Sequence, residues 1–125
     1  EKFADEYISL LQIKTASRET PIKSLSGGNQ QKVIIGRWLL THPEFIILDE
    51  PTRGIDIGTK TEIQKLVLKL ANEGTSVLFI SSEIDEMLRT CNHIAILRDG
   101  EKVAELKDSE LSQKTIMNAI AGTDK

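Results

Sequence analysis

Two short apolar segments separated by a helical pattern constrain the fold of this chain more than any other feature. Residues 44–49 read as a strand that is apolar on both faces, which is typical of a strand inside a sheet. Residues 63–70 place apolar side chains at helical spacing, and residues 76–80 form a second apolar run. Strand, helix and strand in this order predict parallel strands joined by a right-handed crossover, so the expected core is α/β.

Further helices and a hairpin are expected around this core. The helices are predicted at residues 2–11, 27–40, 84–88 and 111–120. The dipeptide Asp99-Gly100 favours a tight turn between strands at 94–97 and 102–106. On the second helix, Ile35 and Trp38 are expected to pack in the core. Because no repeat or linker is visible, residues 1–125 are treated as one continuous unit.

Composition excludes several classes of protein. A net charge of -3 and a pI near 5.4 give no basic surplus, so no nucleic-acid partner is expected. The single cysteine, Cys91, has no partner for an internal disulfide, which points to the cytosol. The apolar runs are far shorter than the roughly 20 residues that span a bilayer. Any connection to a membrane is therefore expected to run through a partner protein.

The segment from Leu25 to Gln30 combines a hydroxyl and two glycines with the expected start of a helix. Backbone N–H groups point outward at such a start, and the helix dipole favours an anion there. This pattern indicates a phosphate site around Ser26, Gly27 and Gly28. Taken alone, the same three residues also fit a simple turn followed by a helix cap.

Asp49 and Glu50 end the first predicted strand. Open α/β sheets bind ligands at the carboxyl ends of their parallel strands. One of these acids can hold Mg²⁺ and the next can orient or deprotonate a water in phosphoryl transfer. The alternative is structural, because acids often end strands where a sheet edge meets solvent.

Together the two segments resemble the ABC ATPase family. Residues 25–32 read LSGGNQQK and match its signature motif, with Asn29 where most members have Gln. Residues 45–56 read FIILDEPTRGID and match its Walker B strand and D-loop. The Asn variant and the sequence after it look especially similar to monosaccharide importers of the ribose, galactose and xylose type. The resemblance covers Lys2 to Ala121 and implies a partial P-loop NTPase fold with a parallel sheet, flanking helices and a C-terminal β-hairpin.

The resemblance also implies roles for individual residues. In this family two cassettes face each other and sandwich ATP with Mg²⁺. The residues implied to contact nucleotide, mostly that held by the opposing cassette, are Ser26, Gly27, Gly28, Asn29, Gln30 and Asp56. By the same carry-over Asp49 helps to hold Mg²⁺, Glu50 is the general base, and Asp56 couples the two sites across the interface.

Glu83 departs from the family pattern. A histidine that contacts the γ-phosphate is expected shortly after the second strand, and Glu83 stands there instead. A carboxylate does not donate a hydrogen bond to phosphate unless it is protonated, so the site containing Glu83 is predicted to hydrolyse ATP slowly or not at all. Importer subunits of this type carry two cassettes, the second degenerate at such positions, and this chain resembles the second. Glu83 also fits a simple acid at a helix start.

The phosphate-binding loop G-x-x-x-x-G-K-[ST] is absent from residues 1–125. In the family this loop lies well upstream of the signature, and the first residue here is Glu1 rather than Met. The chain is therefore expected to be the C-terminal half of a cassette, cut from a longer reading frame. On its own it is expected neither to bind ATP tightly nor to hydrolyse it.

The predicted function is that of an ATPase subunit that powers sugar import through an ABC transporter. The implied partners are an opposing cassette, transmembrane permease subunits and, indirectly, a periplasmic or extracellular sugar-binding protein. The implied location is cytoplasmic, on the inner face of the membrane. The alternative is an interaction module with the ABC fold and no catalysis. Strands that lack their upstream neighbours also predict self-association of the isolated chain.

Overall fold

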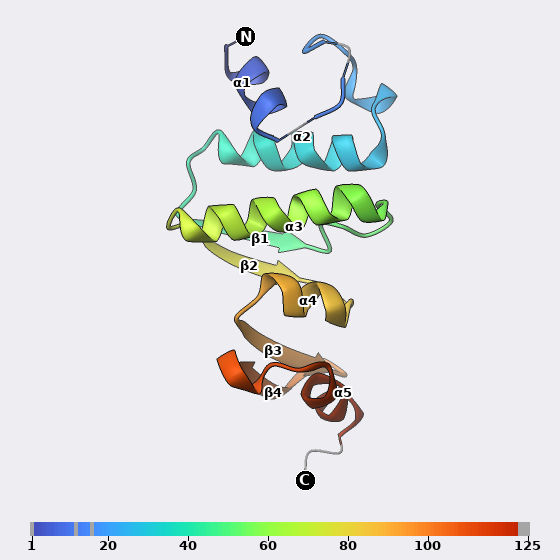
Figure 1. The fold of residues 1–125 in the computed structure, drawn as a ribbon, viewed down its shortest axis with the longest axis vertical. Helices are drawn as coiled ribbons and strands as arrows, with labels where there is room; N and C mark the ends of the chain where they lie inside the picture. The colour runs from blue at the N-terminus through green and yellow to red at the C-terminus, as the bar shows by residue number, and fades with distance from the viewer. Residues whose placement is uncertain (1, 12, 16, 123–125) are drawn as a thin grey trace. The chain divides into compact units, whose positions relative to one another are not determined.

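The structure, a computed structural model, describes residues 2–11, 13–15 and 17–122 of the chain. The chain divides into two compact units, Glu1–Ile80 and Ser81–Lys125 (Figure 1). The first contains both motifs discussed above, and the second contains the hairpin. None of the helices in the described residues is long and apolar enough to cross a membrane.

The first unit is a parallel strand pair with helices. Its elements are α1 (Lys2–Leu10), a 3₁₀ turn η1 (Ile22–Ser24), α2 (Gly27–Leu39), β1 (Phe45–Asp49), α3 (Ile57–Asn72) and β2 (Ser76–Ile80). The strands pair in parallel from Phe45 opposite Ser76 to Asp49 opposite Ile80. The predicted β-α-β core is therefore confirmed, with α3 as its crossover helix.

The core of the first unit lies between its helices and one face of the strand pair. Its apolar members come from α2, β1, α3 and β2 and include Ile35, Leu39, Ile46, Leu48, Ile63, Val67, Leu70 and Phe79. The opposite face of the sheet is uncovered, with Phe45 56% and Ile47 57% exposed. The expectation that both faces of the first strand are buried is wrong for the described chain, because burial alternates along β1.

Trp38 is also placed differently from the prediction. Ile35 is 1% exposed and packs in the core as expected, but Trp38 is 61% exposed. The buried stripe of α2 runs through Lys32, Ile35 and Leu39, whereas Trp38 aligns with Ile34, which is 44% exposed. Residue type alone suggested burial, and helical position decides against it.

The second unit is a helix-flanked β-hairpin. Its elements are α4 (Ile84–Thr90), β3 (His93–Arg98), β4 (Glu101–Lys107), a 3₁₀ turn η2 (Asp108–Glu110) and α5 (Gln113–Ala121). Asp99 and Gly100 both have positive φ, at 53° and 80°, as a type I′ hairpin turn requires, so the predicted hairpin is confirmed. Its core cluster is Ile94, Ile96, Leu106, Ile116 and Ala119.

The last helix begins later than predicted. Ser112 caps α5 by accepting a hydrogen bond from the Thr115 N–H at 3.1 Å, so Leu111 precedes the helix. Ile116 is buried, whereas Ile120 is 43% exposed. The helix ends at Ala121, and Gly122 follows as its C-cap in the left-handed conformation.

Candidate functional site

Ser26 caps the start of α2 with its side-chain hydroxyl. Its backbone is extended, and its Oγ accepts hydrogen bonds from the N–H of Asn29 at 3.2 Å and from Nδ2 of Asn29 at 2.8 Å. The residue is nevertheless exposed, as is Gly27. The motif therefore starts a helix whose first turn faces solvent, the arrangement that attracts anions.

Asn29 and Gln30 point their amides at backbone of their own unit. Asn29 is 8% exposed, and its Oδ1 accepts a hydrogen bond from the N–H of Lys14 at 2.9 Å. Gln30 donates from Nε2 to the carbonyl of Leu25 at 2.9 Å. In this structure both amides hold the polar segment before α2 against the helix start, which fixes the shape of the motif.

The two glycines of the motif sit in opposite surroundings. A side chain on Gly28 would collide with Thr59 of α3, so packing requires a glycine there. A Cβ on Gly27 would meet nothing within 4 Å. Packing within the described residues therefore does not require a glycine at position 27, and the space beside it is open.

Asp49 is the last residue of β1 and Glu50 follows it, at the carboxyl end of the strand pair. Asp49 is exposed, and Glu50 is half-buried with a positive φ of 48°. The Glu50 N–H donates to the carbonyl of Ile80 at 2.9 Å, and its own carbonyl accepts from Arg53 at 3.2 Å. Glu50 is thus held in a conformation that costs a non-glycine residue energy, and such strain often marks a functional site.

Asp56 caps α3. Its carboxylate accepts a hydrogen bond from the N–H of Thr59 at 3.0 Å. Hydrogen bonds from Thr59, first from its backbone and then from its side chain, hold the pKa of Asp56 below its ordinary value. Asp56 is therefore a charged, exposed carboxylate at a helix start.

The starts of α2 and α3 lie at the same end of the first unit. In Figure 1 both helices run in the same direction, and the arrowheads of β1 and β2 point toward the end where the helices begin. Gly28 packs on Thr59, and one turn further along Lys32 pairs with Glu62. The structure therefore places the start of α2 at Ser26, the start of α3 at Asp56 and the end of β1 at Asp49 and Glu50 at the same end of the first unit.

Sequence reasoning assigned no role to Lys32, Thr59 or Glu62. Lys32 is 3% exposed, although lysine is among the residues least often buried. A signal was present, because Lys32 stands four residues after Gly28 and three before Ile35, on the stripe of α2 that faces the core. A charged residue on that stripe indicates a buried ion pair.

Glu83 belongs to the second unit. It stands just before α4, and its side chain makes no capping hydrogen bond. Its N–H donates to the hydroxyl of Ser81 at 3.0 Å. The side chain is exposed.

The carboxylates at the end of β1 can supply one protein ligand for Mg²⁺. Among the described residues no group of three or more His, Cys, Asp or Glu is placed to hold a metal. Mg²⁺ in phosphate chemistry commonly takes one or two carboxylates and completes its shell with water and phosphate oxygens. The exposed carboxylate of Asp49 fits that limited role and does not make a metal site by itself.

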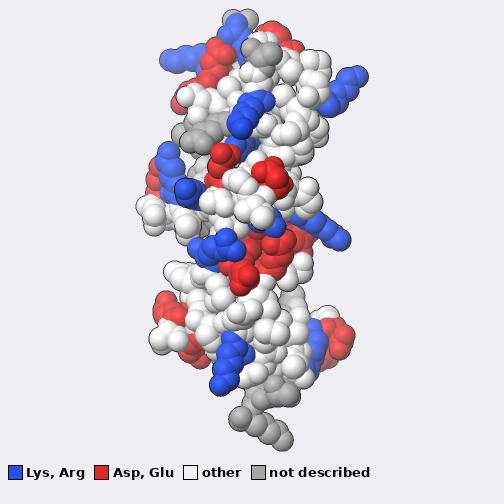
Figure 2. All heavy atoms as spheres, turned by 45° about the vertical axis from the view of Figure 1, so that its right-hand side comes forward, with Lys and Arg blue, Asp and Glu red and all other residues white. Residues whose placement is uncertain are grey.

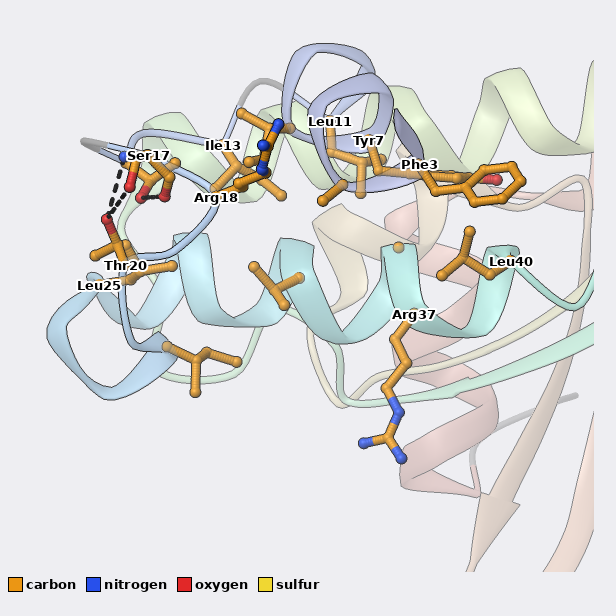
Figure 3. A pocket seen from close by; sticks show the side chains of 16 residues that line it. Phe3, Tyr7, Leu11, Ile13, Ser17, Arg18, Thr20, Leu25, Arg37 and Leu40 are labelled. Carbon is orange, nitrogen blue, oxygen red and sulfur yellow. Dashed lines mark hydrogen bonds between the residues drawn. The ribbon is translucent and has the colours of Figure 1, made fainter. Parts of the chain in front are cut away.

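A pocket of about 260 Å³ lies between α1, the segment before α2, and α2 itself (Figure 3). Its walls are mostly apolar and include Tyr7, Leu11, Ile13, Leu25 and Leu40. Arg37 points away from it, and Arg18 is paired with Asp5 at 2.5 Å. Since the lining offers few polar groups, the pocket does not suit a phosphate.

The surface charge is mixed. On the face shown in Figure 2, Lys and Arg alternate with Asp and Glu, and the described residues drawn there form no continuous basic area. An extended basic surface is the usual footprint of nucleic-acid binding. The visible charge pattern agrees with the acidic composition.

Comparison with known proteins identifies the family. The profile described as ABC transporter matches residues 1–53. The chain is 55% identical to the fructose import ATP-binding protein of Bifidobacterium longum, over 96% of the chain and 24% of that protein. The chain belongs to the ABC transporter ATPase family. It is also 51% identical to the galactofuranose transporter ATP-binding protein of Escherichia coli, over 97% of the chain and 24% of that protein.

Solved ABC cassettes share the fold. One ATP-binding cassette of an ABC transporter superposes with a TM-score of 0.79 at 29% identity, covering 96% of this chain and 46% of that one. The dimeric structure of a bacterial ABC transporter cassette gives 0.75 at 33% identity, covering 85% and 46%. The predicted partial ABC ATPase fold is confirmed, and the chain spans about a quarter of the length of its curated relatives. Membership of this family implies nucleotide binding by the complete cassette.

Proposed function

We propose that this chain is the C-terminal half of a cassette in a longer ATPase that energises monosaccharide import. The main support is that three features lie at the same end of the first unit. They are the start of α2 at Ser26, the start of α3 at Asp56 and the end of β1 at Asp49 and Glu50. Relatives named as fructose and ribose import ATP-binding proteins support the sugar class. Glu83 stands where the family has the histidine that contacts the γ-phosphate, and this departure favours the second, degenerate cassette of that protein.

The exposed first turn of α2 would meet the γ-phosphate of ATP held by the opposing cassette. Gly27 gives the closest approach, because it is exposed and has free space around it. Ser26 presents a capped helix start whose outward N–H groups favour the anion. Asn29 and Gln30 support this geometry through their bonds to Lys14 and Leu25.

Asp49, Glu50 and Asp56 take the remaining roles. Asp49 would hold Mg²⁺, which neutralises phosphate charge when bound. Glu50 would orient and deprotonate the attacking water from its fixed position at the end of β1. Asp56 would carry its negative charge to the interface with the opposing cassette, since its pKa is lowered.

The partners of the complete protein would be an opposing cassette and permease subunits, with a sugar-binding protein acting indirectly. A dimeric cassette structure among the neighbours supports the first of these. The protein would lie in the cytoplasm against the inner face of the membrane through its permease. Relatives named for import support this location.

The roles of Gly27 and Glu50 are separable in the complete ATP-binding protein that carries this sequence. Gly27→Asp puts a carboxylate where the opposing site holds phosphate, so MgATP turnover should fall about 100-fold. Glu50→Gln should lower turnover less than threefold, because the departure from the family pattern at Glu83 predicts that this cassette is the degenerate one and contributes little of the turnover. Asn72→Asp, an exposed position on α3, makes the same change in charge and should leave turnover unchanged.

Each outcome decides one part of the proposal. Full turnover by Gly27→Asp would remove the signature contact. A complete protein without MgATP turnover would sink the ATPase assignment and favour the interaction module. For the isolated chain no turnover is expected, and activity that disappears in Glu50→Gln would overturn that expectation.

A further inference from the structure

Lys32 carries a buried charge that the roles above do not use. It lies on α2, 3% exposed, and its ammonium pairs with the carboxylate of Glu62 on α3. The Glu62 side chain is 41% exposed, so only one end of the pair is out of water. Burying an ammonium costs free energy that charged and polar partners offset, so the ion pair with Glu62 helps to fix the position of Lys32.

The ion pair accompanies a packing contact between the same two helices. Gly28 and Lys32 are one turn apart on α2, and Thr59 and Glu62 are one turn apart on α3. Gly28 packs directly on Thr59, and Lys32 pairs with Glu62. Two contacts in register fix both the separation of the helix starts and the sliding of one helix along the other.

The packing contact between Gly28 and Thr59 lies next to the residues proposed to face the nucleotide. Gly28 follows Ser26 and Gly27 in the first turn of α2. Thr59 donates its N–H to Asp56, the cap of α3, at 3.0 Å. A shift of α3 relative to α2 would therefore move Asp56 relative to Ser26.

We propose that Lys32 and Glu62 are positioning residues that hold the Ser26 and Asp56 helix starts as one rigid surface for the opposing cassette. This inference rests on the proposed function. A Gly28–Thr59 contact alone sets how closely the helices approach. The directed ion pair adds the registry, a use of buried charges that is well attested.

The test measures kcat and KM for MgATP in the complete ATP-binding protein. Glu62→Gln leaves the buried ammonium of Lys32 facing a neutral amide, so the helices should shift and kcat should fall about tenfold. The KM for ATP should stay within about twofold, since positioning acts on turnover rather than on uniform binding. Glu73→Gln, the same change at an exposed acid that directly follows α3, is the matched surface control and should change neither constant.

Two further variants separate positioning from general stability. Lys32→Arg keeps the charge and should retain at least half of the wild-type kcat. The exchange Lys32→Glu with Glu62→Lys restores opposite charges and should recover more activity than Lys32→Glu alone. A variant that is only less stable would regain kcat at lower temperature, whereas a misplaced helix start would not.

The outcomes are distinct. Folded Glu62→Gln with wild-type kcat would overturn the positioning role. If Glu62→Gln does not fold, Glu62→Asp replaces it, because the shorter acid keeps the charge while pulling the pair apart, and an unchanged kcat would again refute the role. A wild-type protein without turnover would instead refute the proposed function.

Discussion

Thr59 occupies the space that a side chain on Gly28 would need. Its methyl group and hydroxyl lie against the first turn of α2, where the starts of α2 and α3 meet. The two glycines of the signature motif therefore differ in how tightly they are packed. Gly28 is set by packing inside the unit, and Gly27 stands in open space.

Gly28→Ala is predicted to destabilise the chain, and Gly27→Ala is not. The new methyl at Gly28 must push Thr59 or α3 aside, at a cost of about 1–3 kcal/mol. Gly27→Ala meets no neighbour and should stabilise by about 0.5 kcal/mol through the entropy of the unfolded chain. Chemical denaturation of both variants measures the difference. Adding Thr59→Ala should recover part of the loss in Gly28→Ala, and equal losses in both glycine variants would contradict the packing argument.

Glu50→Gly is predicted to make the chain slightly more stable. A non-glycine residue at φ 48° is strained, and glycine adopts this conformation without that cost. The gain should be about 0.5 kcal/mol after the greater chain entropy of glycine is counted. Glu73→Gly, at φ -85°, relieves no strain and should lose stability in the same denaturation measurement. A loss in Glu50→Gly as large as that in Glu73→Gly would mean that Glu50 is not strained.

The sequence predicted the elements of the fold better than their burial. The strands, the crossover helix and the Asp99-Gly100 turn follow from local patterns, and each is confirmed. Trp38 and the outer face of β1 were expected inside and lie outside. A pattern shows which face a residue shares with its neighbours, but what covers that face depends on elements elsewhere in the protein.

The candidate site divides in a similar way. The sequence identified Ser26 as a helix cap and Asp56 through the resemblance to the D-loop, and in the structure both residues cap helices. Lys32 and Glu62 were missed, because their pairing joins residues 30 positions apart on different helices. Pairing at that distance depends on how the helices cross, which periodicity within one helix does not reveal.

The cap formed by Asp56 predicts a loss of stability in acid. The folded pKa of Asp56 is lowered by Thr59, so its contribution is fully present above the ordinary aspartate pKa of about 4. It is lost as the pH falls from there through the lower folded pKa. Asp56→Asn keeps a capping oxygen and has no charge to titrate in this range. The stability difference between the two proteins, measured from pH 7 to pH 2.5, should shrink toward low pH, and a constant difference would show that Asp56 does not titrate as described.

The uncovered face of the strand pair predicts that the isolated chain associates with itself. Phe45 and Ile47 on β1 and Leu78 on β2 are all more than 40% exposed on neighbouring strands. Contiguous apolar surface of this kind is a common site of association, and the strand pair offers open hydrogen-bonding edges in the described chain. Light scattering should therefore give a mass above 13.9 kDa that rises with concentration. Ile47→Lys should bring the mass toward the monomer, whereas Ile57→Lys, the same change at an 81% exposed residue off the sheet, should not. A monodisperse monomer at high concentration would contradict this prediction.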